Sequence, residues 1–432
     1  MKAKKLFKCV ITLFSLQGIL MGAQIKHINI NNIEVPVIFE KQTSLPILNM
    51  QLVFQNSGSI QDKKLNGIAS FSAKLLNEGT KKLGSTKFAS KLESNAISLN
   101  ATSGFETFVI ELSSLKEVND KAFNYLSDLL KDPNYDKSII EKIKTIQIGL
   151  LKRKQNDYDY VARNQLKEIL FKDTPLEKPS SGTIESISKI KLDDVKNFIS
   201  NTFNLSNLII VAGGDIEYDE LSKKIKESLK SLKTGEKKEL KSFNITAKPT
   251  TKELIKDTQQ AYIYFGSKFN AIPKDKDNYM AKVASFILGG SGFGSRLMEE
   301  IRVKRGLAYS AYGYVSINKS HSYFTGYLQT KLESAKEAKK LVSKIVDNFV
   351  EKGVTKEELD SAKSFLLGSE PLRTETLAQR LGRAFNLYYK GLDQDYPKKE
   401  LEKIQNLKLE DLNKYIKAHK EIINLSFSIV RK

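Results

Sequence analysis

Cysteine is almost absent from this chain. The 432 residues contain one, Cys9, which lies in the N-terminal apolar stretch. If that stretch is removed on export, the mature chain has no thiol, which excludes a disulfide framework, a thiolate zinc site and a cysteine nucleophile. A chain without cysteine suits an oxidising compartment such as a bacterial periplasm.

Histidine is nearly as scarce. The chain has three, His27, His321 and His419. None is accompanied by a second histidine or a glutamate in the arrangement that places two zinc ligands on one helical face. We therefore expect all three to be surface or packing residues, and we expect this chain to bind no metal.

Long apolar runs are also missing, apart from the stretch from Cys9 to Met21. Four lysines precede this stretch and the small residues Gly22 and Ala23 follow it, a pattern typical of a secretory signal peptide. It is shorter than the roughly 20 apolar residues that a membrane span requires. We predict a signal peptide over residues 1–23, cleaved after Ala23, and a periplasmic location without a stable membrane span. Retention of the stretch as an anchor is the alternative.

Charge is abundant but unclustered. The net charge of +20 would permit binding to nucleic acid or to an anionic surface. The lysines are scattered among acidic residues along helical stretches, as on a solvated face, and no arginine-rich block or aromatic-interleaved basic stripe occurs. We expect no nucleic-acid partner.

Strand and helix patterns are intermixed along the chain. Alternating runs at Leu48–Phe54 and Phe105–Leu112 predict strands, whereas Lys116–Lys131 and Leu192–Phe203 have the period of amphipathic helices. This mixture predicts an α+β fold in which helices cover a mainly antiparallel sheet.

The second half of the chain echoes the first at an offset of about 215 to 218 residues. Ala69-Ser70-Phe71 recurs as Ala284-Ser285-Phe286, and Leu192-Asp193-Asp194-Val195 recurs as Leu409-Glu410-Asp411-Leu412. Echoes that keep their order indicate duplication of one domain. We predict domains over 24–232 and 253–432, joined by a polar, lysine-rich linker over 233–252.

The segment Gly67–Thr80, GIASFSAKLLNEGT, resembles the helix of pitrilysin and insulinase-type zinc peptidases that carries the inverted motif H-x-x-E-H. The frame is kept, but Ser70, Ala73 and Lys74 stand where the family has its two histidines and its general base. The family's third ligand, a glutamate, would fall near Gly149 or Leu150. The resemblance therefore implies a metal site that has been lost.

A second segment, Gly289–Tyr314, resembles the C-terminal-domain segment of the same peptidases, in which an arginine and a tyrosine seven residues apart contact the peptide. Here these residues are Arg302 and Tyr309. The glycines of this segment lack the order of a phosphate-binding loop, and Met280–Leu288 before them continues a helical pattern. We expect a turn that lines the substrate chamber.

A third segment, Leu99–Thr107, resembles the family's edge strand, which pairs with an extended substrate through main-chain hydrogen bonds. The resemblance implies that Asn100, Ala101 and Thr102 hold a peptide by strand addition. An ordinary strand of the sheet is the competing interpretation.

Family members of this size are half of a four-domain clam-shell and pair with a second chain, as in the mitochondrial processing peptidase. The resemblance implies the non-catalytic subunit of a periplasmic heterodimer, which binds peptide substrates beside a partner that carries H-x-x-E-H and the zinc. A non-enzymatic peptide-binding or scaffold protein of the same fold is the alternative. A serine-lysine dyad of Ser70 and Lys74, four residues apart, is a third and weaker interpretation.

Overall fold

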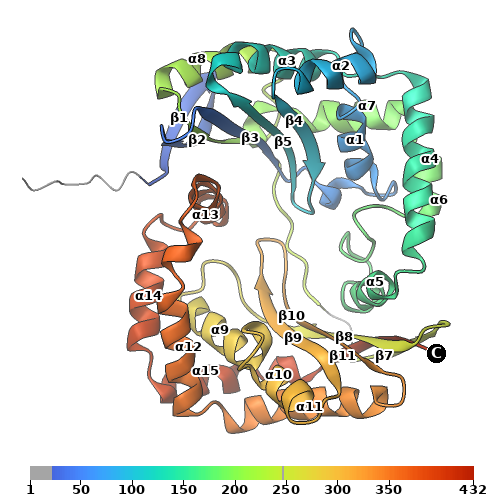
Figure 1. Cartoon of the computed structure of the whole chain (residues 1–432), viewed down its shortest axis with the longest axis vertical. Helices are drawn as coiled ribbons and strands as arrows, with labels where there is room; N and C mark the ends of the chain where they lie inside the picture. Colours follow the sequence, from blue (N-terminus) through green and yellow to red (C-terminus); the bar gives the residue numbers. More distant parts are fainter. Residues whose placement is uncertain (1–21, 246–247) are drawn as a thin grey trace, which may run out of the picture.

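The structure, a computed structural model, describes residues 22–245 and 248–432. Most of the predicted signal peptide, residues 1–21, lies outside this range. The described residues form two mixed, mostly antiparallel sheets covered by helices, which confirms the predicted α+β class (Figure 1). No helix in the described ranges is both long and apolar enough to cross a membrane.

The first sheet is built from the N-terminal half of the chain. Its strands lie in the order β1-β2-β6-β3-β5-β4, and β2 with β6 is its only parallel pair among the described strands. The strands are β1 Gln24–Ile30, β2 Ile33–Lys41, β3 Ile47–Gln55, β4 Ser98–Ser103, β5 Thr107–Leu115 and β6 Leu208–Gly214. The helices are α1 Ile68–Leu76, α2 Gly84–Glu93, α3 Asn119–Lys131, α4 Lys137–Lys154, α5 Tyr158–Leu170, α6 Ile184–Lys189, α7 Leu192–Thr202 and α8 Tyr218–Leu229.

The second sheet has the order β7-β11-β8-β10-β9, with β7 and β11 parallel. Its strands are β7 Thr251–Ile255, β8 Gln260–Lys268, β9 Ala308–Ile317, β10 Ser322–Lys331 and β11 Ser426–Arg431. Its helices are α9 Asn278–Ser285, α10 Arg296–Met298, α11 Ala335–Lys352, α12 Lys356–Gly368, α13 Leu377–Lys390, α14 Tyr396–Asn406 and α15 Leu409–Ala418, with π-helical turns at Phe286–Gly290 and Glu299–Val303.

The two sheets have the same topology. The order β2-β6-β3-β5-β4 in the first corresponds to β7-β11-β8-β10-β9 in the second, and the parallel pair occupies the same place in both. The predicted duplication is thereby confirmed at the level of the fold. Residues 234–245 and 248–250 form neither helix nor strand, although the exact domain limits remain a prediction.

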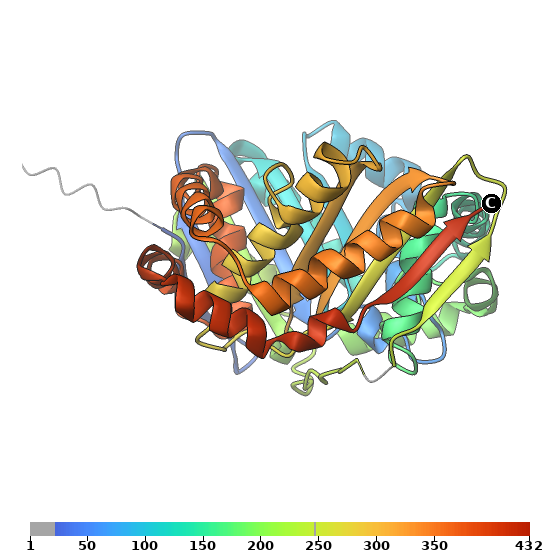
Figure 2. The same cartoon turned by 90° about the horizontal axis from the view of Figure 1, so that it is seen from below.

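Each sheet buries one face under helices of its own domain. The core of the first domain contains Phe54, Phe71 and Phe108, and that of the second contains Phe265, Phe324 and Phe349, all at most 2% exposed. Figure 2 shows the long helix α11 crossing the outer face of the second sheet. Because the outer faces are covered locally, the inner faces are left for contacts between the domains.

The two domains exchange one helix each across their inner faces (Figure 1). Helix α5 of the first domain packs on β8 and β11, where Leu166 and Leu170 meet Tyr264 and Tyr323. Its counterpart α13 packs on β2 and β6, where Leu377 and Leu381 join Ile38 and Val211. Residues of the first domain therefore help to stabilise the second sheet, and residues of the second domain help to stabilise the first sheet.

Two glycines permit these close approaches. A Cβ atom on Gly213 of β6 would lie 2.9 Å from Leu381 Cδ1, and one on Gly266 of β8 would lie 3.0 Å from Leu170 Cδ1. Both distances are shorter than ordinary van der Waals contact, so a side chain at either position would force the facing leucine of the exchanged helix to move.

Candidate functional site

The helix α1 carries the segment that resembles the zinc-motif helix. The buried carboxylate of Asp62 accepts hydrogen bonds from the main-chain N–H groups of Gly67 (2.7 Å) and Ala69 (3.1 Å). These bonds satisfy donors that the first turn of a helix leaves free. The start of α1 is therefore fixed, as is the direction in which its following residues point.

Residues Ser70, Ala73 and Lys74 lie on one face of α1, as the spacing predicts. The Lys74 ammonium donates a hydrogen bond to Gln147 Oε1 at 2.6 Å, and Gln147 Nε2 donates to the carbonyl oxygen of Ser181 at 2.6 Å. Partial burial, and secondarily the nearby charge of Lys154, lowers the pKa of Lys74. An ammonium thus occupies the position of a metal ligand, and these residues do not fit a zinc ion.

The partner of Lys74 on α4 is a residue that the sequence did not single out. Counting along the sequence places the family's third-ligand position near Gly149 or Leu150, and the residue that contacts Lys74 is Gln147, three positions before Leu150. Gln147 is 1% exposed and falls in the buried row Ile140, Ile143, Gln147, Leu151 of α4. A polar residue in an otherwise apolar buried row was the signal in the sequence that could have identified it.

No group of three or more histidine, cysteine or acidic side chains suited to a metal ion occurs among the described residues. His321 packs against the rings of Phe105 and Phe171, and His419 stacks on Phe269. His27 lies on β1 near Glu34. The three histidines therefore sit in three separate places.

Arg302 and Tyr309 are brought together in the second domain. The guanidinium carbon of Arg302 lies 4.5 Å from the centre of the Tyr309 ring and 4.7 Å from that of Phe293. Both rings face solvent, with Tyr309 81% and Phe293 69% exposed. An arginine held between two exposed rings is prepared for contact with another molecule, because cation–π stacking orients its planar donor group. We call these three residues the Arg302 stack.

Phe293 was not identified from the sequence. It lies in a turn in which Gly292 and Gly294 have φ angles of 69° and 87°. The expected turn is present, and the helical pattern before it continues as α9 and the π-helical turn. A large aromatic residue among glycines was the available signal, because such a residue has little local structure to pack against.

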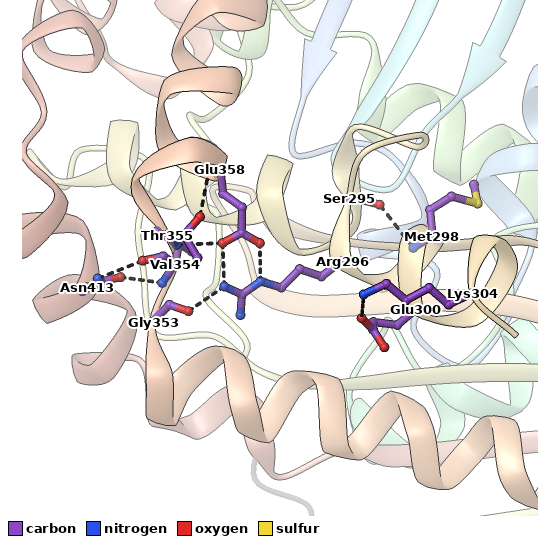
Figure 3. Close-up of polar contacts among 10 residues, drawn as sticks. All are labelled: Ser295, Arg296, Met298, Glu300, Lys304, Gly353, Val354, Thr355, Glu358 and Asn413. Carbon is purple, nitrogen blue, oxygen red and sulfur yellow. Dashed lines mark hydrogen bonds and ion pairs between the residues drawn. The ribbon is translucent and has the colours of Figure 1, made fainter.

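Arg296 anchors the segment that precedes Arg302 in the chain (Figure 3). Arg296 makes two hydrogen bonds of 2.6 Å to the carboxylate of Glu358 on α12 and one of 2.7 Å to the carbonyl oxygen of Gly353. Burial opposes the charge on Glu358, but the hydrogen bonds from Arg296 and from the main-chain N–H of Thr355, together with the charge of Arg296, lower the pKa of that carboxyl. Such bidentate pairs are geometrically strict, so the turn that carries Arg302 is held in place.

Asn100, Ala101 and Thr102 lie in β4, which is the last strand of the first sheet. The expected edge strand is therefore present. However, the side chain of Asn77 already contacts it. Ala101 N–H donates to Asn77 Oδ1 at 2.7 Å, and Asn77 Nδ2 donates to the Ala101 carbonyl oxygen at 3.0 Å. Sequence reasoning did not single out Asn77.

Two copies of one α+β domain, with Ser70, Ala73 and Lys74 along one face of α1 in the first and an arginine-tyrosine stack in the second, define a peptidase-like architecture. Comparison with known protein families supports this assignment. Residues 37–184 match the family described as Insulinase (Peptidase family M16), and residues 189–366 match the one described as Peptidase M16 inactive domain.

Relatives extend the match to the whole chain. A non-peptidase homolog, YmxG, from Helicobacter pylori is 45% identical over 426 residues, covering 98% of each chain. The chain therefore belongs to the M16 peptidase family, as the sequence motifs predicted. Its fold resembles the crystal structure of a peptidase M16 inactive domain from Pseudomonas fluorescens, with a TM-score of 0.85, 23% identity and coverage of 94% of this chain and 98% of that one.

A longer structure shares the same fold. The periplasmic protease PqqL from Escherichia coli matches with a TM-score of 0.75 at 15% identity. The match covers 94% of this chain but 47% of PqqL. This chain thus corresponds in fold to about half of that protease.

Proposed function

We propose that this chain is the non-catalytic subunit of a two-chain peptidase. In this proposal it binds the peptide through the Arg302 stack, beside a homologous partner that carries H-x-x-E-H and the zinc. The proposal rests on a contrast between the two domains. Lys74 occupies a ligand position in the first domain, whereas Arg302 stacks on the exposed ring of Tyr309 in the second.

The size of the chain supports pairing. It corresponds in fold to about half of a longer protease, so a second two-domain chain would complete an enclosure of four domains. The H. pylori relative is named a non-peptidase homolog, which agrees with a role that does not require the chain to cut peptides alone. The lysine-rich, apolar N-terminal stretch supports export, and we place the pair in the periplasm.

The chemistry of the stack suits a peptide. A guanidinium group presents several donors in one plane, and a phenol both donates and accepts. Together they can anchor substrate carbonyl groups and stabilise the negative charge that develops on the carbonyl oxygen when water attacks. Neither group has to change its protonation state to do so.

The test is reconstitution with a zinc-motif homologue from the same genome. We expect Arg302→Ala combined with Tyr309→Phe to lower kcat/KM for unfolded peptides by about 100-fold or more, the scale for loss of oxyanion donors. Lys304→Ala is the matched control, since Lys304 lies on the same turn and pairs with Glu300 at the surface. Full activity of the double variant would contradict the proposal and favour a scaffold role.

A further inference from the structure

The edge of the first sheet is already hydrogen-bonded by a side chain of the same protein. Asn77 both accepts a hydrogen bond from the N–H of Ala101 and donates one to its carbonyl oxygen. A peptide that adds to a sheet edge makes this same pair of bonds with one residue of the edge strand. The carboxamide of Asn77 carries the donor and the acceptor of a peptide group, so it imitates an incoming strand.

The register identifies which groups are covered. Ala101 is paired opposite Ile110 of β5. Main-chain groups of successive residues point to opposite sides of a strand, so the two groups that Asn77 takes are those that Ala101 directs away from β5. Ala101 also lies near the middle of β4, which spans Ser98–Ser103. Any peptide long enough to pair along β4 would have to replace Asn77.

Helix α1 places Asn77 at this edge. Asn77 follows the last residue of α1, and its main-chain N–H still donates to Ala73 at 3.2 Å. It therefore continues the row of Ser70, Ala73 and Lys74 along the same helical face. Lys74 in this row is bound by Gln147 of α4, and Asn77 is bound by β4. This face of α1 would contact a peptide at a metal site. Its polar side chains Lys74 and Asn77 already have hydrogen-bond partners within the chain.

The second domain also covers its sheet edge. Gly313 of the edge strand β9 pairs with Gly326 of β10, and the main chain of Gly289 packs directly against it. A Cβ atom on Gly289 would lie 2.5 Å from Gly313 N and 2.7 Å from its oxygen. Main-chain pairing is thus obstructed there as well, whereas the two rings of the Arg302 stack stand exposed in the same domain.

We propose that Asn77 closes the β4 edge and is the residue that determines how this chain binds peptide, namely through side chains of the second domain and not by strand addition to the first. The inference rests on the proposed function for its peptide-binding part. The closure of the edge stands on the hydrogen bonds of Asn77 alone.

Hydrogen exchange in the lone mature chain tests the closure. In the wild type the amide of Ala101 is protected by Asn77. We expect Asn77→Ala to accelerate its exchange about tenfold or more, the scale for loss of local hydrogen bonding. Asn77→Asp keeps an acceptor for the N–H and should leave intermediate protection. Asn95→Ala is the control, because Asn95 bonds to Lys91 at the end of α2 and not to β4. Equal exchange rates in the wild type and Asn77→Ala would overturn the closure.

Peptide binding tests the consequence. The probe is a fluorescent, unfolded ten-residue peptide of alternating threonine and valine with lysine ends. We expect Asn77→Ala to bind it about tenfold more tightly than the wild type, because two competing hydrogen bonds are gone. The Ala101 amide of the variant should regain protection when peptide is added. Protection of the wild-type Ala101 region by the peptide at similar affinity would overturn the proposal.

The two proposals fail in different experiments. Loss of the Arg302 requirement in the reconstituted pair would contradict the proposed function and leave the exchange result at Ala101 unchanged. Fast exchange at Ala101 in the wild type would contradict the closed edge and leave the Arg302 requirement intact.

Discussion

Tyr389 donates a hydrogen bond of 2.7 Å to Glu106 Oε2, although 283 residues separate them. Glu106 lies in the turn between β4 and β5, and its other oxygen accepts from the main-chain N–H of Ser320 at 3.0 Å and from the Ser320 hydroxyl. Ser320 lies in the equivalent turn between β9 and β10 of the second domain. One carboxylate therefore joins two equivalent hairpins and the exchanged helix α13.

We predict that Glu106→Ala destabilises the chain by about 2–4 kcal/mol, because it leaves the buried Ser320 and Tyr389 without their acceptor. Tyr389→Phe removes one of the bonds and should cost about 1 kcal/mol. Urea unfolding measures both. Glu111→Ala, on the exposed part of β5, is the control and should change stability by less than about 0.5 kcal/mol. Similar values for Glu106→Ala and Glu111→Ala would show that the carboxylate does not hold the domains together.

A second prediction concerns pH. His321 Nδ1 lies 2.8 Å from Ser320 Oγ. Burial lowers the pKa of His321 from 6.5 to about 4, with Glu106 opposing the change and Lys167 adding to it. The folded chain thus resists protonation of His321. As the pH falls from 6.5 towards 4, His321 takes up a proton in the unfolded chain but not in the folded chain, so its contribution to the free energy of unfolding decreases. The full effect is up to about 3 kcal/mol.

Urea unfolding at several pH values checks this. His321→Gln should flatten the fall in stability between pH 6.5 and pH 4. The matched variant His27→Gln, at a partly exposed position of β1, should keep the wild-type slope. If His321→Gln retains the full slope, other groups cause the pH dependence.

The lost metal site gives a third prediction. Combining Ser70→His, Ala73→Glu, Lys74→His and Gln147→Glu should create a site for one zinc ion, because two histidines four residues apart on a helix would face a carboxylate on α4. The same set with Leu150→Glu in place of Gln147→Glu should bind zinc far more weakly. Metal analysis and calorimetry distinguish them. Tighter binding by the Leu150 set would restore the position that sequence counting predicted.

Much of the fold could be predicted from the sequence. Local patterns at Leu48–Phe54 and Leu192–Phe203 correspond to β3 and α7, and the repeated Ala-Ser-Phe correctly indicated two copies of one domain. These signals are local or lie in the order of similar segments, so they can be recognised in the sequence without knowledge of tertiary contacts.

The exchange of α5 and α13 could not be predicted in this way. Leu166 and Leu381 belong to amphipathic patterns that would suit packing on either sheet. The choice of sheet is made by contacts distant in sequence, such as Tyr264 with Asp159 and Arg380 with Glu40. The hydrophobic periodicity of the sequence gives no information about those pairs.

The candidate site was predicted in part for the same reason. The frame residues identified Arg302, Tyr309, Ser70, Ala73 and Lys74, which lie where the helix and strand patterns place them. Asn77, Gln147 and Phe293 act through side chains that reach other segments. Asn77 continued the helical row of the motif by three residues, and that spacing was the one clue available.

The most direct measurement is the zinc content and peptidase activity of the purified mature chain, alone and after co-expression with a zinc-motif homologue from the same genome. Our account predicts that the lone chain is metal-free and inert and that the pair cleaves unfolded peptides with dependence on Arg302 and Tyr309. Stoichiometric zinc and peptide cleavage in the lone chain would contradict it, because Ser70, Ala73 and Lys74 could then not be the remains of the only metal site.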